Sequence, residues 1–290
     1  MIMLSTPAMK RDLRVLWAKS FPDSQTVIHF FFQHRYRPDQ CLVMVQDGRV
    51  VSALHLLPAQ IVTEDGRCPV QYIYAAATLP EYRNTGCMTK LLHAAEELGV
   101  SRGIPYTALV PSGQSLFAYY ERAGFVPYFE TRTVRITRQE LKHLARGGRE
   151  KRAEVSARLL SSVRIDALRN EIGNVLWDRD AFAFAAEYQQ IAQGEVFSAA
   201  TAGSVGYAFF QQEEQTGIVT EAIANEAVLS GLANQLQSKC RSPLILFCLP
   251  VDSPLFPGKG EITCTGMLKV NGEIGQLPNG KHPYLGLDLN

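Results

Sequence analysis

The chain has 290 residues, which is more than one domain usually needs and suits two domains that each bury a core. Hydrophobic residues make up 46% and charged residues 20%, as in an ordinary folded soluble protein, and a net charge of only +1 argues against a nucleic-acid-binding protein. The apolar runs are too short for a signal sequence or a membrane span, so we expect a cytoplasmic protein that does not bind membranes.

Charge is divided unevenly along the chain. Residues 1–152 hold 20 Lys or Arg and 13 Asp or Glu, giving +7, while residues 153–290 hold 9 and 15, giving −6. This split is either uneven surface decoration or a functional division. In the second case the basic half would attract an anionic cofactor and the acidic half a cationic amine.

The six cysteines form no C-x-x-C pair, and none stands beside a histidine at the spacing of zinc ligands. We therefore expect reduced thiols and no bound metal.

The first half predicts a mixed sheet that begins with an antiparallel meander and continues through a crossover. Asp47-Gly48 is a strong hairpin signal, and Gly99 ends a helix whose apolar residues recur at helical spacing. The strand after this crossover should pair parallel to the last strand of the meander. The predicted elements are helices at 12–19 and 26–36, strands at 41–46, 50–62 and 70–78, a helix at 88–98, a strand at 106–110, a helix at 115–123 and a strand at 125–136.

The same order of elements returns in the second half, after a basic stretch that contains Gly147-Gly148. The counterpart of the first strand-to-helix loop is Ala222 to Ala227, which has no glycine and places Glu226 in the first turn of a helix. The predicted elements are a helix at 177–192, strands at 196–201, 204–211 and 217–224, a helix at 225–237, and strands at 244–249 and 265–270.

The loop of the first half, Arg83-Asn84-Thr85-Gly86-Cys87-Met88, leads from a strand into a helix. Such a loop places backbone N–H groups at the positive end of the helix, where they can hold a pyrophosphate. Together with Pro80-Glu81-Tyr82-Arg83 before it and the later Tyr120-Glu121-Arg122-Ala123-Gly124-Phe125, it resembles the GCN5-related N-acetyltransferase (GNAT) superfamily. Met88 departs from that pattern, which has a small residue there. The nearer comparison is the two-domain branch of enhanced intracellular survival acetyltransferases, which carries a large apolar residue at this position.

The resemblance covers about the first half of the chain and implies an α/β (α+β) GNAT fold with a mixed, mostly antiparallel sheet. We expect a GNAT domain that binds acetyl-CoA at 1–139, a basic linker at 140–152, and a degenerate GNAT-like domain without cofactor at 153–290. The negative charge of Glu226 in the second domain would repel a pyrophosphate.

The resemblance also implies the residues that hold acetyl-CoA. Backbone groups at the end of the strand would bind the pantetheine arm, and the loop with the first helical turn would bind the pyrophosphate. Ser115 lies at a turn that relatives use to touch CoA, although helix capping alone also explains Ser112 and Ser115. The predicted cofactor-binding residues are Ala76, Ala77, Thr78, Arg83, Asn84, Thr85, Gly86, Cys87, Met88, Thr89 and Ser115.

Tyr120 matches the family tyrosine near the CoA sulfur and is the predicted catalytic residue. A phenol with a pKa near 10 can protonate a departing thiolate. The alternative is a packed aromatic side chain. Tyr119 would point elsewhere on the helix.

A general base is harder to assign, because no carboxylate occurs between Val70 and Leu79. Tyr72 and Tyr74 could relay a proton through water, although packing on a strand also explains their alternation. The survival-protein branch uses its terminal carboxylate. The end of this chain, Tyr284 to Asn290, leaves no room for the third domain of those relatives, so we do not expect the carboxylate of Asn290 to serve as the base.

Two further groups of residues allow more than one interpretation. Phe30, Phe31, Phe32 and Tyr36 are either an apolar wall of the acceptor site or ordinary core. Cys87, in the first turn of a helix, is either an oxidisable thiol or simply buried beneath the loop.

We expect an N-acetyltransferase that moves an acetyl group from acetyl-CoA to a primary amine, on a small molecule or peptide, by direct attack in a ternary complex. The alternatives are a non-catalytic acyl-CoA-binding or regulatory module, and a transferase of longer acyl groups. The sequence leaves open the acceptor, the general base, the oligomeric state, and whether the second domain lines the acceptor site.

Overall fold

The structure of the chain is a computed structural model that describes residues 1–146, 155–273 and 275–287. These residues form two compact units. Unit 1 consists of 1–128 and 266–279, and unit 2 consists of 129–265 and 280–290, apart from the residues not described. The basic linker expected at 140–152 is a helix as far as Ala145, and its glycine-containing part from 147 onward lies outside the described residues.

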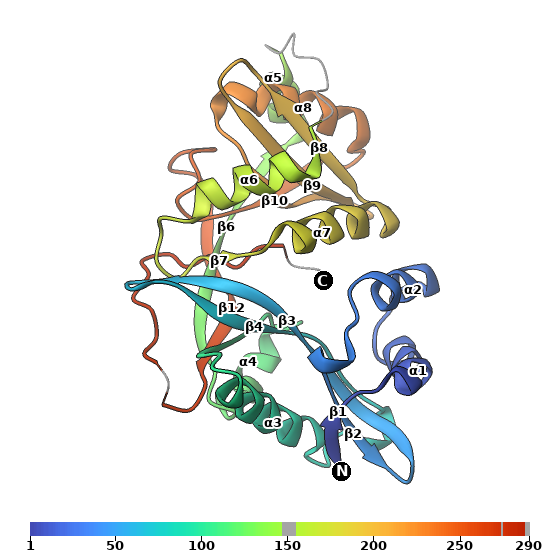
Figure 1. The fold of residues 1–290 in the computed structure, drawn as a ribbon. Helices are drawn as coiled ribbons and strands as arrows, with labels where there is room; N and C mark the ends of the chain where they lie inside the picture. Colours follow the sequence, from blue (N-terminus) through green and yellow to red (C-terminus); the bar gives the residue numbers. More distant parts are fainter. Residues whose placement is uncertain (147–154, 274, 288–290) are drawn as a thin grey trace. The chain divides into compact units, whose positions relative to one another are not determined.

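Unit 1 follows the predicted order of elements closely (Figure 1). Its two parallel strands are β4 and β5, as expected from the crossover helix between them. The elements are β1 (Ile2–Leu4), α1 (Lys10–Ser20), α2 (Gln25–His34), β2 (Cys41–Gln46), β3 (Arg49–Thr63), β4 (Gly66–Thr78), α3 (Cys87–Ser101), β5 (Tyr106–Leu109) and α4 (Phe117–Glu121).

The strands of unit 1 are ordered β1-β2-β3-β4-β5, and helices cover both faces of this sheet. On β4, Gln71 points to α3 and donates to the carbonyl of Ala95 at 2.8 Å. Tyr74, on the opposite face, packs its ring at 5.6 Å from that of Trp17 in α1. Because side chains alternate along a strand, α1 and α3 lie on opposite faces of the sheet.

Unit 2 repeats this plan with two helices, three antiparallel strands, a helix and a parallel strand. The parallel pair is formed by β10 and β11. The elements in the second half of the chain are α6 (Ala157–Leu168), β7 (Val175–Leu176), α7 (Arg179–Ile191), β8 (Glu195–Ala200), β9 (Val205–Gln212), β10 (Thr216–Ile223), α8 (Glu226–Lys239), β11 (Leu244–Leu249) and β12 (Glu261–Val270).

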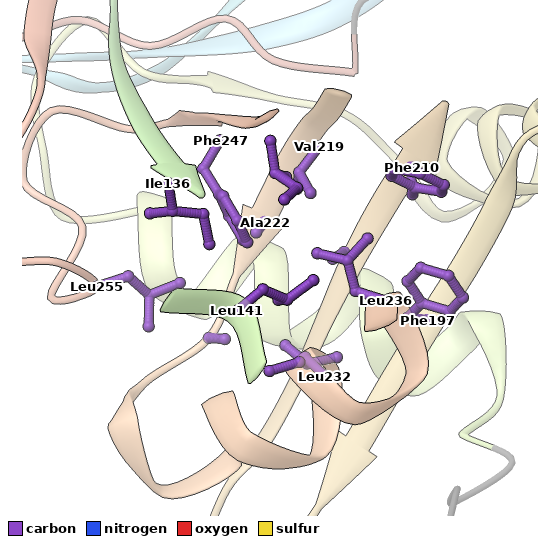
Figure 2. Close-up of a cluster of buried hydrophobic side chains, with 14 of the residues drawn as sticks. Ile136, Leu141, Phe197, Phe210, Val219, Ala222, Leu232, Leu236, Phe247 and Leu255 are labelled. Carbon is purple, nitrogen blue, oxygen red and sulfur yellow. The ribbon is translucent and has the colours of Figure 1, made fainter. Parts of the chain in front are cut away.

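One core of unit 2 lies between its sheet and the helices α5 (Arg138–Ala145) and α8 (Figure 2). Leu141 of α5 and Leu232 of α8 meet side chains from the strands, such as Phe210 and Phe247. Phe182 of α7 packs on the other face of the sheet, with its ring 5.2 Å from that of Tyr207. Unit 2 therefore has helices on both faces as well.

Each unit takes its last strand from the other half of the chain. β6 (Val126–Thr137) follows β5 in sequence, but its residues Arg132–Thr137 pair antiparallel with β11 in unit 2. In return, residues Met267–Val270 of β12 pair antiparallel with β5 in unit 1. The sequence pattern had assigned the strand at 265–270 to the second domain. Side-chain alternation within a strand does not indicate the neighbour with which that strand pairs.

Among the described residues, no helix is both long and apolar enough to cross a membrane. The same residues contain no group of three or more His, Cys, Asp or Glu side chains arranged to hold a metal ion.

Candidate functional site

Strand β4 leaves its parallel neighbour before it ends. Pairing with β5 extends only to Tyr72, although β4 continues to Thr78. Between these residues the register with β3 shifts, and Ala75 has a φ of 49°, a left-handed value that is uncommon for a residue with a Cβ. This is a β-bulge, and it separates the end of β4 from β5. The edge of Ala76 to Thr78 that faces away from β3 thus has no strand neighbour among the described residues.

An exposed loop connects this strand end to α3. Asn84 and Gly86 have φ values of 62° and 79°, so the backbone turns through the left-handed region twice within three residues. Helix α3 then begins at Cys87, and no side chain caps its first N–H groups. Unsatisfied N–H groups at a helix start, supported by the helix dipole, attract an anion.

The space in front of the loop is open. A Cβ built on Gly86 would meet no heavy atom within 4 Å, and the first turn of α3 contains no acidic residue. An open approach, uncapped N–H groups and a first helical turn without a carboxylate suit a pyrophosphate. The residues present therefore fit the anionic part of acetyl-CoA.

Side chains around the loop hold its shape. Arg83 donates from Nε to the carbonyl of Thr78 at 3.2 Å, and Thr85 donates from its hydroxyl to the carbonyl of Tyr82 at 2.6 Å. Ser52 of β3 donates to the carbonyl of Ala77 at 2.9 Å. These bonds fix the strand end and the loop in place, so the predicted residues 76–78 and 83–89 lie next to each other in unit 1.

The first turn of α3 contains the residue that departs from the family pattern. Met88 is half-buried and lies in a turn without side-chain capping, so its backbone N–H stays available despite the large side chain. Cys87 is buried and 3.2 Å from the hydroxyl of Thr85, which agrees with the interpretation that it lies beneath the loop.

Tyr120 lies on α4, 8% exposed, between the rings of Tyr119 at 5.2 Å and Phe125 at 5.8 Å. Burial raises the pKa of the Tyr120 phenol to about 12, with a further increase from Tyr119. The ring is thus packed, as one interpretation held, and the phenol keeps its proton at neutral pH. Its role as an acid stays a prediction.

Tyr119 contacts Thr89, which the sequence did not indicate. Its hydroxyl lies 3.2 Å from that of Thr89 in the first turn of α3. This bond joins α4, which carries Tyr120, to the helix that carries the loop. The two residues are 30 positions apart, and only the return of the chain after β5 brings them together.

The helix predicted at 115–123 is shorter in the structure, where α4 spans Phe117–Glu121. A 3₁₀ turn (Gln114–Leu116) precedes α4, and neither helix start is capped by a side chain. The capping interpretation of Ser112 and Ser115 is therefore wrong, because the chain enters α4 through this turn rather than from a serine. Both serines are exposed, and a contact of Ser115 with CoA stays a prediction.

No carboxylate stands on β4 near the bulge, and the aromatic residues there are core. Tyr72 and Tyr74 are buried and stacked, with ring centroids 6.4 Å apart. Phe31 and Phe32 are almost fully buried against Trp17, which favours the interpretation of this group as core. The terminal carboxylate of Asn290 lies outside the described residues.

His55 on β3 is a titratable side chain that lies beside this aromatic cluster. It pairs with Tyr74 across the strands, and its ring lies 4.9 Å from that of Phe31. Burial lowers the pKa of His55 to about 3, so the imidazole is neutral and a weak base.

The counterpart of the loop in unit 2 is very different. Only residues 224–225 separate β10 from α8, whereas residues 79–86 separate β4 from α3. The side chain of Asn225 also accepts from the N–H of Ala227 at 3.1 Å, and Glu226 places a negative charge in the first turn. This helix start is capped and acidic, which makes it a poor site for a pyrophosphate.

The comparisons with known proteins agree with this geometry. Residues 4–128 match the family model described as acetyltransferase (GNAT) domain. Among solved structures, a GCN5-related N-acetyltransferase from Kribbella flavida is similar at a TM-score of 0.70 and 18% identity, over 93% of this chain and 70% of that one. Eis1 from Mycobacterium abscessus is similar at a TM-score of 0.67 and 15% identity, over 93% and 73%.

A putative acetyltransferase from Pyrococcus horikoshii, at a TM-score of 0.56 and 13% identity, is matched over 99% of this chain and 94% of its own. At these identities the likeness is one of fold. Among curated proteins, none matches the sequence significantly.

Proposed function

We propose that this chain, a member of the GNAT superfamily through residues 4–128, transfers an acetyl group from acetyl-CoA to a primary amine. The main support is the arrangement in unit 1 of an unpaired strand edge at 76–78 beside an uncapped helix start at Cys87. Bound acetyl-CoA would supply the activated thioester. An amine on a small molecule or peptide would attack it directly in a ternary complex.

In this proposal the chain holds the cofactor mainly through its backbone. The N–H groups from Gly86 to Thr89 would bind the pyrophosphate, and the free edge of Ala76 to Thr78 would bind the pantetheine arm as a further strand does. The exposed side chains of Arg83 and Asn84 flank this surface. Unit 2, whose helix start is capped by Asn225, would hold no cofactor.

Tyr120 would donate the proton that the leaving thiolate needs. A pKa of about 12 keeps the phenol protonated until the thiolate forms beside it. Burial beside Tyr120 would also raise the pKa of the leaving thiol, because it disfavours the charged thiolate. The pKa difference between the phenol and the thiol would therefore be smaller.

Replacing Tyr120 with Phe should lower kcat by roughly 10²-fold and leave the Kd for acetyl-CoA nearly unchanged, because the ring still packs and only the proton is lost. Steady-state rates with the best amine found, together with calorimetric titration, measure both. Tyr119→Phe is the matched control, since it removes the adjacent hydroxyl and its bond to Thr89. Equal rates for Tyr120→Phe and wild type would remove Tyr120 from the mechanism.

The missing carboxylate on β4 leads to a prediction about pH. We infer that the amine reacts as the free base delivered from solvent, so log kcat/KM should rise with a slope of one towards the pKa of the amine, about 10. Tyr120 acts in its protonated form and loses the proton only above a pH of about 12. At pH values below about 12, the rate should therefore show no decrease with rising pH while the protein stays folded. An ascending limb that levels off near pH 6 or 7 would instead show a protein base.

The same missing carboxylate, with Met88 in the loop, favours a second candidate, a non-catalytic acyl-CoA-binding module. Release of free thiol from acetyl-CoA with a panel of primary amines, compared with binding of acetyl-CoA alone, separates the two. A transferase predicts thiol release that requires the amine, and a binding module predicts binding with no release. Repeating the assay with longer acyl-CoA donors tests the remaining alternative.

A further inference from the structure

A cavity of about 260 Å³ lies within unit 2. Two of its walls are the segments that follow the parallel strands, 223–225 after β10 and 250–254 after β11. Helix α6 packs on β9 and β10 (Figure 1). Its residues Val163, Ala167 and Leu168 form the third wall of the cavity. The cavity thus opens beyond the carboxyl ends of two adjacent parallel strands.

This place in the fold is where a ligand crevice is expected. In open α/β sheets, ligands bind outside the carboxyl ends of the strands, where neighbouring strands separate. The pairing of β10 with β11 ends at Val219, and the register of β10 with β9 shifts between Val219 and Glu221. Unit 1 has the same bulge and separation beside its cofactor loop. Unit 2 therefore has a crevice at the corresponding place, but the start of α8 is capped by Asn225 and does not suit a phosphate.

The lining of the cavity is mainly apolar, with the buried amide of Asn174 at its inner end and carboxylates at its exposed edge. Val163, Val205 and Ile223 are among the apolar residues, and the carboxylates of Glu171 and Asp252 belong to exposed side chains. Within the described part of the chain, Glu171 forms no ion pair and its side chain no hydrogen bond. A cavity with a mainly apolar interior and an acidic edge suits a molecule with an apolar body and a positive charge.

Two basic side chains near the cavity are already engaged. The charge of Arg132 acts on Asp252, but its guanidinium donates to five backbone carbonyls between Val251 and Lys259 and so holds that loop together. His282 lies 2.7 Å from a carboxylate oxygen of Glu130. The hydrogen bonds of both side chains are therefore made to groups other than Glu171.

The inner end of the cavity is held in place by hydrogen bonds. Asn174 is 3% exposed, donates to the carbonyl of Leu168 at 3.0 Å and accepts from the N–H of Tyr284 at 2.9 Å. A wall fixed by such bonds does not need to be ordered when a ligand binds, which lowers the entropic cost of binding.

We propose that this crevice is a second ligand site, which binds a small organic ammonium ion with a compact apolar body and does not bind CoA. The apolar body would fill the space between α6 and the strand ends, and the ammonium group would pair with Glu171 and Asp252. The volume lies below the usual range of about 300–1,000 Å³ for drug-sized ligands, which restricts the site to small amines.

The probe for this site is benzylamine, with benzyl alcohol as its neutral analogue, and binding is measured on the full chain by ligand-detected NMR titration. Benzylamine should bind, and benzyl alcohol should bind at least about tenfold more weakly, since a charge-assisted hydrogen bond is lost. Glu171→Gln should weaken benzylamine by about the same factor. Glu187→Gln on α7, which removes an exposed carboxylate from outside the cavity, should have no effect.

A second variant tests the location of binding. Ala167 is an exposed residue of α6, and Ala167→Phe adds a ring beside the cavity without disturbing buried packing. This variant should lose benzylamine binding while its circular dichroism spectrum and Tm match those of wild type. Binding of benzyl alcohol as tight as that of benzylamine would overturn the proposal. Undiminished binding of benzylamine by both Glu171→Gln and Ala167→Phe would also overturn it, because the amine would then bind elsewhere on the chain.

Discussion

Gly86→Glu should abolish detectable binding of acetyl-CoA to the full chain. The backbone of Gly86 has a φ of 79°, a conformation that costs other residues about 1 kcal/mol or more. Its Cβ would enter the open space in front of the first turn of α3, where we place the pyrophosphate. The added carboxylate would lie beside the negative charges of the pyrophosphate at the helix start. Backbone strain and charge repulsion would therefore both oppose binding.

The matched control for this substitution lies at the other end of the same helix. Gly103 also has a positive φ, of 66°, and a Cβ built there would also meet no heavy atom within 4 Å. Gly103→Glu therefore introduces the same charge and a similar backbone strain away from the loop. Thermal-shift titration should show stabilisation of wild type and Gly103→Glu by acetyl-CoA, and none of Gly86→Glu. Equal stabilisation of all three would refute the assignment of the loop.

Glu221→Gln should destabilise unit 2 by about 3–5 kcal/mol, because it leaves a buried guanidinium without its counter-ion. Arg164 and Glu221 are each 1% exposed, with Nε and Oε1 3.1 Å apart. The carboxylate also accepts from the hydroxyls of Tyr207 and Tyr284 and from the N–H of Leu287. Burial, and the adjacent negative charge of Glu221, raise the pKa of both tyrosines well above the ordinary value.

The two tryptophans of the chain allow the units to be followed separately. Trp17 lies in unit 1, and Trp177 lies in unit 2, where its indole donates to the carbonyl of Leu285. In a Trp17→Phe background, urea unfolding followed by fluorescence reports on unit 2. The double variant Arg164→Met with Glu221→Leu should lose less stability than Arg164→Met alone or Glu221→Leu alone. The double variant removes both charges, whereas each single variant leaves one buried charge unpaired. A Glu221→Gln transition that coincides with that of the background protein would contradict this account of the pair.

Local patterns in the sequence were sufficient to predict most elements of unit 1. Cys41–Gln46 and the start of β5 at Tyr106 were predicted correctly, because turn residues and strand alternation act over a few positions. The parallel pairing of β4 with β5 followed from the crossover helix between them. The loop between β4 and α3 was predicted for the same reason, since its glycine and the helix start are adjacent in sequence, and its role in binding a cofactor stays a prediction.

Helix α6 was not predicted, and Arg164 explains why. This charged residue stands on the buried side of the helix, where the pattern of an amphipathic helix requires an apolar residue. Its partner Glu221 is 57 positions away, so nothing local indicates that the charge is compensated. The bulge at Ala75 and the bond between Tyr119 and Thr89 were missed for a related reason, since both depend on contacts between distant segments.

A crystal structure of the full chain grown with CoA tests the central claim most directly. We predict a single CoA per chain, with its pyrophosphate at the N–H groups of residues 86–89, its pantetheine arm along 76–78, and its sulfur near the hydroxyl of Tyr120. The capped start of α8, at Asn225, should hold none. A pyrophosphate bound at α8, or one bound away from the loop at Gly86, would contradict the account.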